Sequence, residues 1–114
     1  MIVAADFDGT LHDNRDGDAI GKPIQSVIDY LKQHTVFIIT KRSKEDHKVI
    51  TSFLNKINLQ TKHIYFTESD RIDILKRIHA DIYLDDRLSN LRPIAKALPY
   101  VRCFRVIHGK MIQI

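Results

Sequence analysis

The chain has 114 residues, of which 44% are hydrophobic and 28% charged, and its 18 basic and 14 acidic side chains give a net charge of +4. This length and composition predict one globular domain spanning residues 1–114 and exclude a chain that is disordered throughout. A membrane helix needs an apolar run of about 20 residues, which the sequence lacks, so we expect no membrane partner.

The compartment is indicated by the N-terminal segment and by the cysteine content. The first residues, MIVAADFDG, lack the basic start of a secretory signal. Cys103 is the single cysteine of the chain, so an internal disulfide is excluded and a reducing compartment fits best. We therefore expect a cytoplasmic protein.

Short apolar runs with the composition of buried strands recur along the chain. They are rich in β-branched and aromatic residues and almost continuously apolar, which is typical of strands covered on both faces of a parallel sheet. The runs lie at residues 2–7, 36–40, 63–67, 81–85 and 100–107. Residues 111–114, which follow the turn His108-Gly109-Lys110, predict a final hairpin strand.

Apolar residues at helical spacing fill the segments between these strands. The stripes are Ile24, Val27, Ile28 and Leu31; Val49, Ile50, Phe53, Leu54 and Ile57; Ile74, Leu75 and Ile78; and Leu91, Ile94, Ala95 and Leu98. The expected first residue or cap of each helix is, in order, Pro23, Ser43 (in a capping box with Asp46), Ser69 or Asp70, and Ser89 or Asn90.

The alternation of strands and helices predicts an α/β domain with a mostly parallel, Rossmann-like sheet and helices on both of its faces. Residues 11–22 are polar and contain glycine, so they predict a loop or small flap. In such sheets, ligands bind at the carboxyl ends of the strands. The function therefore depends on which side chains lie at those ends.

Polar and charged residues close four of the predicted strands. They are Asp6 and Asp8; Thr40, with Lys41 and Arg42; Thr67, with Arg71 four residues on; and Asp85 with Asp86. Four carboxylates at one edge would repel one another unless a cation held them. Because Mg²⁺ prefers hard oxygen ligands and shares its shell with phosphate, this convergence predicts a magnesium site that handles a phosphorylated substrate.

The first strand ends with an aspartate pair that can divide the chemical work. Residues two apart in a strand face the same side, so Asp6 and Asp8 are expected to address one site while Phe7 enters the core. One carboxylate could then act as a nucleophile and the other as a general acid and base. Gly9 permits a sharp turn after the pair.

These residues resemble three motifs of the haloacid dehalogenase-like (HAD) superfamily, over residues 2 to about 90. The run Asp6-Phe7-Asp8-Gly9-Thr10-Leu11 resembles motif I, Thr40 at the end of an apolar strand resembles motif II, and Asp85-Asp86 after a strand resembles motif IV. The resemblance implies a HAD-like fold and phosphatase activity. Because the dehalogenases of this superfamily lack an acid at the position of Asp8, it implies phosphoryl chemistry.

The resemblance also implies a role for each residue. Asp6 would attack phosphorus, and Asp8 would protonate the leaving group and then activate water. Mg²⁺ would be held by the Asp6 carboxylate, the Asp8 main-chain carbonyl and Asp85, with Asp86 acting through water. The remaining expected site residues are Thr40, which would grip the phosphoryl group; Asn90, which would support the acids; and Gly9, Thr10, Lys41 and Arg42, which would contact the substrate.

The family's third motif is usually a lysine before the fourth strand, and its counterpart here is not obvious. The candidates are Lys62, Arg71, Lys76 and Arg77. Lys62 precedes the third strand, at the opposite edge of the sheet. Lys76 and Arg77 lie about 8–9 Å along the following helix from its start, at about 1.5 Å per residue. Arg71 lies in the first turn and is the choice; Lys76 is second, because some small relatives place the lysine nearer the paired acids.

The chain leaves no room for the cap domain that often covers the site in this superfamily. Predicted helices and strands fill the segments on both sides of Thr40, and only the flap at 11–22 remains. The substrate would be a phosphorylated small molecule, a nucleotide or a polynucleotide end. An open site either takes a large substrate or borrows a cover from another subunit of a homo-oligomer.

Two alternatives from other functional classes stay open. A phospho-accepting receiver domain of a signalling pathway shares the α/β architecture, but its acidic pair follows the first strand, whereas the adjacent pair here is Asp85-Asp86. A catalytically silent protein with the same fold would keep the acids and bind a partner. Turnover of phosphate esters would separate either alternative from the enzyme.

Overall fold

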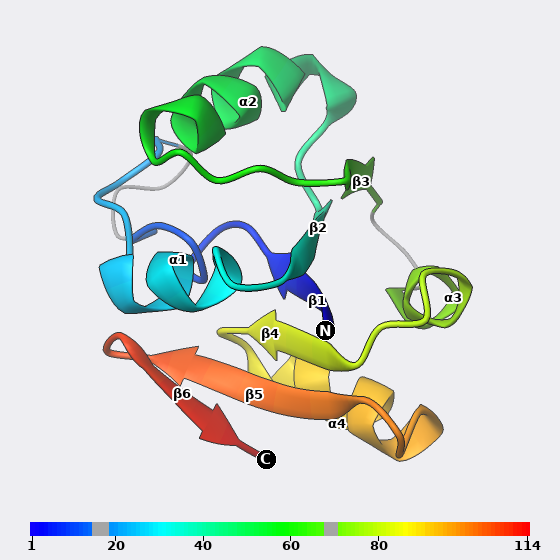
Figure 1. Ribbon diagram of the computed structural model, residues 1–114. Coiled ribbons are helices and arrows are strands. Elements are labelled where there is room, and N and C mark those ends of the chain that lie inside the picture. The colour runs from blue at the N-terminus through cyan, green and yellow to red at the C-terminus, as the bar shows by residue number, and fades with distance from the viewer. Residues whose placement is uncertain (15–18, 68–70) are drawn as a thin grey trace.

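A six-stranded sheet with the strand order β3-β2-β1-β4-β5-β6 runs through the molecule (Figure 1). The computed structural model describes residues 1–14, 19–67 and 71–114. Its strands are β1 (Ile2–Asp6), β2 (Thr35–Thr40), β3 (His63–Phe66), β4 (Ile82–Asp85), β5 (Arg102–Ile107) and β6 (Lys110–Gln113). Its helices are α1 (Gln25–Leu31), α2 (His47–Lys56), α3 (Arg71–Arg77) and α4 (Leu88–Ala97), with a 3₁₀ turn at Lys44–Asp46.

The predicted α/β class and mostly parallel sheet are confirmed. β1 pairs in parallel with β2 and β4, β2 with β3, and β4 with β5. β6 is antiparallel to β5, as the hairpin prediction required, and His108 and Gly109 in the turn both have positive φ angles. None of the helices in the described ranges is long and apolar enough to cross a membrane.

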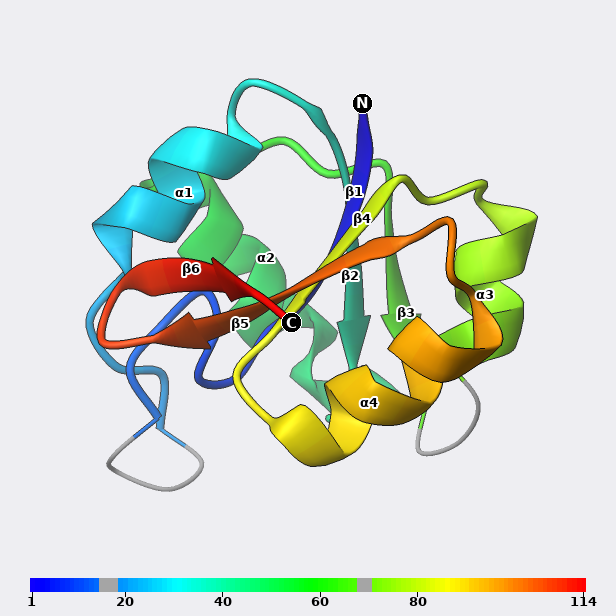
Figure 2. The same ribbon diagram turned by 90° about the horizontal axis from the view of Figure 1, so that it is seen from below.

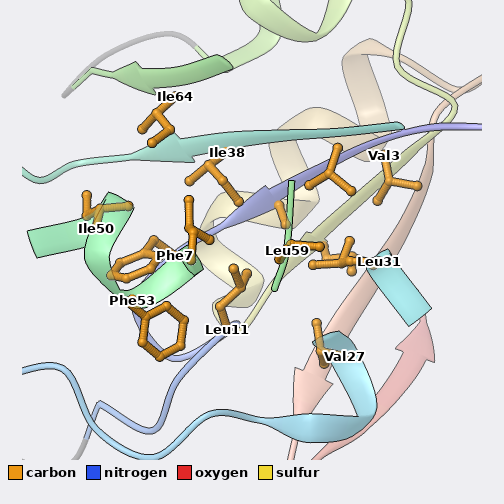
Figure 3. Packing of buried hydrophobic residues seen from close by; sticks show 14 of the residues in the cluster. Val3, Phe7, Leu11, Val27, Leu31, Ile38, Ile50, Phe53, Leu59 and Ile64 are labelled. Carbon is orange, nitrogen blue, oxygen red and sulfur yellow. The ribbon is translucent and has the colours of Figure 1, made fainter. Parts of the chain in front are cut away.

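Helices cover both faces of the sheet, which explains why its strands are nearly all apolar (Figure 2). On one face, α1 and α2 bury Val27, Leu31, Ile50 and Phe53 against strand residues that include Ile38 (Figure 3). On the other face, α3 and α4 pack on a second cluster. That cluster includes Ala4, Ile39, Ile74, Tyr83, Leu91 and Cys103.

The helix starts differ from several sequence predictions. α1 begins at Gln25 after Ile24, so Pro23 precedes the helix instead of occupying its first position. α4 is preceded by Arg87, earlier than Ser89 or Asn90. Both helices begin without a side-chain cap, because packing of the apolar stripe outweighs capping in deciding where a helix starts.

The second helical segment also departs from its prediction. Ser43 caps the 3₁₀ turn, but its side chain accepts from the backbone N–H of Glu45 at 3.0 Å instead of forming a box with Asp46. Val49, placed on the apolar stripe, is 48% exposed, while Ile50 is fully buried. The predicted caps of the third helix, Ser69 and Asp70, lie outside the described residues.

The predicted flap at 11–22 is tied to the body of the protein at both of its ends. The backbone N–H of Asp13 donates to the carbonyl of Lys22 at 2.8 Å, and that of Ile24 donates to the carbonyl of Leu11 at 2.8 Å. Leu11 and His12 are fully buried. Residues 15–18 of the flap lie outside the described residues, and the part that is described forms an ordered stem.

Candidate functional site

Three of the predicted carboxylates meet at the carboxyl ends of two neighbouring strands. Asp6 ends β1, and Asp85 and Asp86 lie at the end of β4. One oxygen from each of the three lies within 4.8 Å of the others. β1 pairs with β2 on one side and β4 on the other, so this acidic cluster lies where the strand order reverses, the position at which open α/β sheets bind ligands.

Gly9 allows the chain after β1 to pass directly over the acidic cluster. Its φ angle is +78°, and a Cβ placed on it would lie 2.3 Å from Oδ2 of Asp86. Any side chain at this position would therefore displace the Asp86 carboxylate as well as strain the backbone. The glycine of the predicted motif I is required by packing against the acid of the predicted motif IV.

Arg71 brings a buried positive charge into the acidic cluster. Its Nη1 donates to Asp6 Oδ1 at 3.1 Å and to Asp85 Oδ2 at 3.0 Å, and the side chain is only 6% exposed. The choice of Arg71 over Lys62, Lys76 and Arg77 thus selected a residue that reaches the acids. Lys62 lies at the opposite edge of the sheet, beside the start of β2, and Lys76 and Arg77 are exposed in the last turn of α3.

Asp85 is fixed by several donors in addition to Arg71. The Tyr83 hydroxyl donates to Oδ2 at 2.6 Å, Asn90 Nδ2 donates to the same oxygen at 3.1 Å, and the backbone N–H of Arg87 donates to Oδ1 at 3.0 Å. Arg71 Nη1 also donates to the Tyr83 hydroxyl. A fully buried carboxylate held in this way cannot rotate freely, so its position is set before any ligand arrives.

The acidic cluster perturbs the ionisation of its own members. Burial, reinforced by the charge of Asp85, raises the pKa of Asp6 well above its ordinary value, although Arg71 acts in the opposite direction. Burial and Asp85 likewise raise the pKa of Asp86. Burial would lower the pKa of Arg71, but Tyr83, Asp6 and Asp85 raise it, so the guanidinium stays charged. The cluster carries more negative charge than this single cation offsets.

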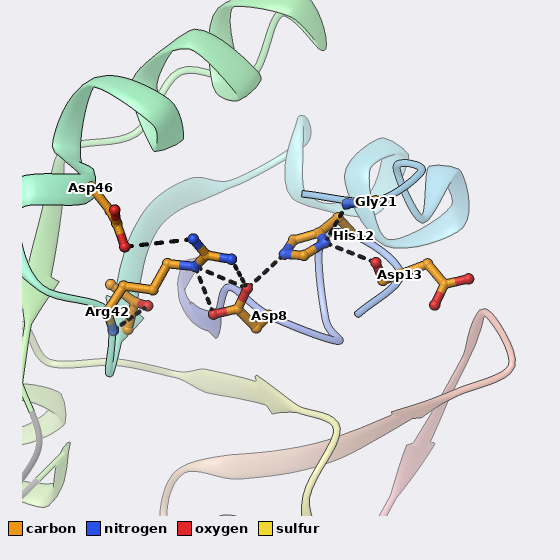
Figure 4. A network of polar contacts seen from close by, with 7 residues as sticks. Asp8, His12, Asp13, Gly21, Arg42 and Asp46 are labelled. Carbon is orange, nitrogen blue, oxygen red and sulfur yellow. Dashed lines mark hydrogen bonds and ion pairs between the residues drawn. The ribbon is translucent and has the colours of Figure 1, made fainter. Parts of the chain in front are cut away.

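Asp8 occupies a different environment, although it is only two residues from Asp6. β1 ends at Asp6, so the strand alternation expected to aim both acids the same way does not extend to Asp8. Arg42 Nε donates to both carboxylate oxygens of Asp8 at 3.0 Å, and Nη2 donates to Oδ1 at 2.9 Å (Figure 4). Arg42, expected to contact the substrate, pairs with Asp8, the proposed acid and base, and Asp46 lies 3.5 Å from its other terminal nitrogen.

His12 is the second partner of Asp8 and was not singled out in the sequence. Its Nε2 lies 2.7 Å from Asp8 Oδ1, and its Nδ1 accepts from the backbone N–H of Gly21 at 3.0 Å (Figure 4). Nδ1 also lies 3.0 Å from the Asp13 carbonyl oxygen. Because an ionised carboxylate can only accept, the proton of the contact with Asp8 is on Nε2 and His12 donates to Asp8. The fully buried ring packs against both Phe7 and Phe53. His12 thus joins Asp8 to the stem of the flap.

These partners oppose the effect of burial on Asp8. Burial alone would raise the pKa of the carboxyl, but hydrogen bonds from His12 and Arg42, together with the Arg42 charge, hold it below the ordinary value of 3.8. Asp8 is therefore an ionised hydrogen-bond acceptor in this structure. Asp6 and Asp86 are shifted in the opposite direction.

A hollow of about 140 Å³ lies over the acids on the carboxyl edge of the sheet. Its described lining residues are Asp6, Asp8, Asn14, Lys41, Arg71, Arg87 and Asn90. The structure thus brings together both acids of the predicted motif I, Arg71, Asn90 and the exposed Lys41. Thr40 and Thr10 are fully buried; the Thr40 oxygen accepts the Arg42 backbone N–H at 3.1 Å, and Thr10 Oγ1 has no hydrogen-bond partner among the described residues.

Sequence reasoning did not single out Tyr83, His12, Asn14 and Arg87 as site residues. Tyr83 could have been predicted as a neighbour of Asp85, because it lies two positions before Asp85 and so shares its face of the strand. His12 and Asp8 are four residues apart, but the turn that brings them together is not encoded by a periodic pattern. No protein-family model, curated protein or solved structure matches the chain.

Proposed function

We propose that the protein is a Mg²⁺-dependent phosphomonoesterase of the HAD-like type that acts through an aspartyl-phosphate on Asp6. The observation that carries the proposal is the acidic cluster of Asp6, Asp85 and Asp86, with one oxygen of each within 4.8 Å, beside a hollow that also exposes Asp8 and Arg71. This combination offers a nucleophile, a second carboxylate and a cation around one small space. Lys41, Arg71 and Arg87 in the lining of this hollow of about 140 Å³ offer positive charge to a phosphoryl group.

The residues of the acidic cluster fit a hard divalent cation. Asp86 Oδ1 is buried and has no hydrogen-bond partner among the described residues, so one oxygen of the cluster lacks compensation. Burial and mutual repulsion raise the pKa values of Asp6 and Asp86, which a cation would reverse. Carboxylate oxygens are the ligands that Mg²⁺ prefers. Asp6, Asp85 and Asp86 would hold it, and when bound it would supply positive charge to the reacting phosphoryl group.

The proposed first step is attack by a carboxylate oxygen of Asp6 on phosphorus. A bond forms between that oxygen and phosphorus while the bond from phosphorus to the leaving alcohol oxygen breaks, and Asp8 gives that oxygen a proton. Arg71 lies 3.1 Å from Asp6 Oδ1 and would neutralise charge on the phosphoryl oxygens without a change of protonation. In the second step, Asp8 takes a proton from the water that cleaves the aspartyl-phosphate.

Asp8 is present in the ionised form that the second step needs. His12 and Arg42 donate to its carboxylate and hold its pKa low after the opposing effect of burial. The first step needs the protonated form, which must arise when a substrate occupies the hollow. Substrates with good leaving groups, such as aryl phosphates, need little proton transfer in that step and should be the best first probes.

A catalytically silent binding protein is the second candidate, and the position of Arg71 favours it. Arg71 Nη1 bridges Asp6 and Asp85, which partly neutralises the acids without any metal. The receiver-domain alternative gains no comparable support, since its phospho-accepting aspartate would end β3 and that strand ends at Phe66. The enzyme and the silent protein differ in one measurable property, which is turnover.

The test is hydrolysis of a panel of aryl and alkyl phosphates with Mg²⁺ and with EDTA. We expect Mg²⁺-dependent turnover that falls below about one-thousandth in Asp6→Asn, because the nucleophile is lost. Asp8→Asn should still release the aryl alcohol once and then accumulate phosphoenzyme, detectable as a mass increase on the intact protein. Asp73→Asn, at an exposed position of α3, is the matched control and should keep full activity.

Two results would contradict the proposal. Absence of turnover in wild type across the whole panel would favour the silent binding protein. Turnover that survives Asp6→Asn would exclude Asp6 as the nucleophile, since an asparagine side chain cannot form the aspartyl-phosphate.

A further inference from the structure

A second and larger cavity opens beside the acidic cluster, on the same edge of the sheet. This groove has a volume of about 750 Å³ and lies between the start of α1 and the turn that joins β5 to β6. Both ribbon views show the β5–β6 turn beside the beginning of α1 (Figures 1 and 2). Its volume is in the range of about 300–1,000 Å³ that is usual for small-molecule sites.

The groove starts at the proposed reaction centre. Gly9 and Asp86 line it, so its inner end is formed by the chain that passes over the acidic cluster. Asn14 lines both the groove and the hollow. Oδ1 of Asn14 is buried and has no hydrogen-bond partner among the described residues, so an unpartnered acceptor lies where the two cavities adjoin. A ligand with its phosphate in the hollow could therefore extend into the groove past Asn14.

A hydrogen bond joins the two walls of the groove. Ser26, in the first turn of α1, donates a hydrogen bond to the carbonyl of Gly109 in the β5–β6 turn, and both residues line the groove. The two walls are thus joined at this point. A groove of about 750 Å³ has the size of a small-molecule site, which favours a small ligand over the end of a polynucleotide.

The walls of the groove differ in chemistry. Pro23, Ile24, Val106 and Ile107 supply apolar surface. Polar groups that can donate or accept hydrogen bonds are supplied by other residues, which include Lys22, Gln25 and His108. A sugar phosphate offers little that could cover the apolar side chains. A ligand with a flat apolar face and a polar edge would satisfy both kinds of wall.

We propose that the groove binds the alcohol part of the substrate and that the substrate is a nucleoside 5′-monophosphate. The base would cover the apolar side chains with its face and use its edge for hydrogen bonds, the sugar would pass Asn14, and the phosphate would lie in the hollow. This inference rests on the proposed function, because it assigns the hollow to the phosphate. It departs from the expectation that an open site without a cap either takes a large substrate or borrows a cover from another subunit.

The experiment compares Gln25→Trp with Gln33→Trp. Gln25 lines the groove and is exposed at the start of α1, and Gln33 is exposed beyond the end of the same helix. Filling the groove should raise KM for nucleoside 5′-monophosphates at least about tenfold, with little change in kcat/KM for phenyl phosphate. Gln33→Trp should change neither. Equal effects of Gln25→Trp on both substrates, or better turnover of a 5′-phosphorylated oligonucleotide than of the mononucleotides, would overturn the proposal.

A second measurement does not depend on catalysis. Titration of wild-type protein with unphosphorylated nucleosides, followed by NMR, should shift the amide signals of Ile24, Ile107 and His108, and Gln25→Trp should abolish these shifts. If no phosphomonoester is turned over but these shifts occur, the phosphatase function fails and the groove assignment stands. If nucleosides cause no shifts while other phosphomonoesters are hydrolysed, the groove assignment fails and the phosphatase function stands.

Discussion

Asp6 and Asp8 are separated by one residue, yet the fold gives them opposite surroundings. Asp6 is buried beside Asp85 and Asp86, and its pKa is raised by burial and by its acidic neighbours. Asp8 is half-buried, and donors from His12 and Arg42 overcome the effect of burial and lower its pKa. The two regions show that the role of a carboxylate is decided by its neighbours. Asp6 lies in an excess of negative charge that attracts a cation, and Asp8 is already compensated.

The largest effect on stability is expected at Arg71, which forms ion pairs with the carboxylates of both Asp6 and Asp85. Arg71→Met should lower the free energy of unfolding by about 3–5 kcal/mol, because it leaves buried carboxylates without their partner. Urea unfolding without metal measures this. Lys76→Met, at an exposed position of the same helix, should change stability by less than about 0.5 kcal/mol. Similar losses of unfolding free energy in both variants would show that the acidic cluster does not depend on the positive charge of Arg71.

The next effect is stabilisation by Mg²⁺. A ligand that binds only the folded state at about 100 times its dissociation constant stabilises it by about 2.7 kcal/mol, so Mg²⁺ should raise the melting temperature of wild type. Asp86→Asn should lose most of this rise, since Asp86 supplies the uncompensated buried oxygen. Asp46→Asn, in the Asp8 region, should keep it. A rise of equal size in both variants would place the cation elsewhere.

A smaller effect is expected from the Tyr83 hydroxyl. Tyr83→Phe removes a 2.6 Å hydrogen bond to Asp85 but leaves the donors from Arg71, Asn90 and Arg87 in place. The free energy of unfolding should fall by about 1 kcal/mol, as for a typical hydrogen bond. Tyr100→Phe, at an exposed position, is the control. An unchanged stability in Tyr83→Phe would mean that the hydroxyl is dispensable to the cluster.

The smallest effects are opposite pH dependences of the two aspartates. The pKa of Asp6 is raised, so wild type should be less stable than Asp6→Asn at neutral pH, and the difference should shrink as the pH falls through the folded-state pKa towards 3.8. The pKa of Asp8 is lowered, so wild type should be more stable than Asp8→Asn above pH 3.8, and that advantage should be lost below it. Unfolding curves of the metal-free proteins across this range measure both. If the stability differences between wild type and the two variants had the same sign, the contrast between Asp6 and Asp8 would be refuted.

Most of the secondary structure and the edge that carries the site could be predicted from local patterns. Continuous apolar residues predict a buried strand such as β2, and apolar residues at helical spacing predict a helix such as α2. Both patterns can be read from residues that are near one another along the chain. The carboxyl edge then follows from the rule that parallel strands end on one side. The details that failed, such as Val49 on the buried stripe and the starts of α1 and α4, are those that packing decides.

The sequence by itself determined the α/β class and which acids end the strands, because the periods of strands and helices and the spacing of motif residues are local properties. Only the tertiary structure decided what each acid contacts. Arg42, which pairs with Asp8, is 34 residues away along the chain, and Arg71, which pairs with Asp6, is 65 residues away. Whether a carboxylate is compensated depends on its burial and on charges that are near in space but far along the chain. Asp6 therefore lies in a centre with excess negative charge, whereas Asp8 is held by donors that compensate its charge.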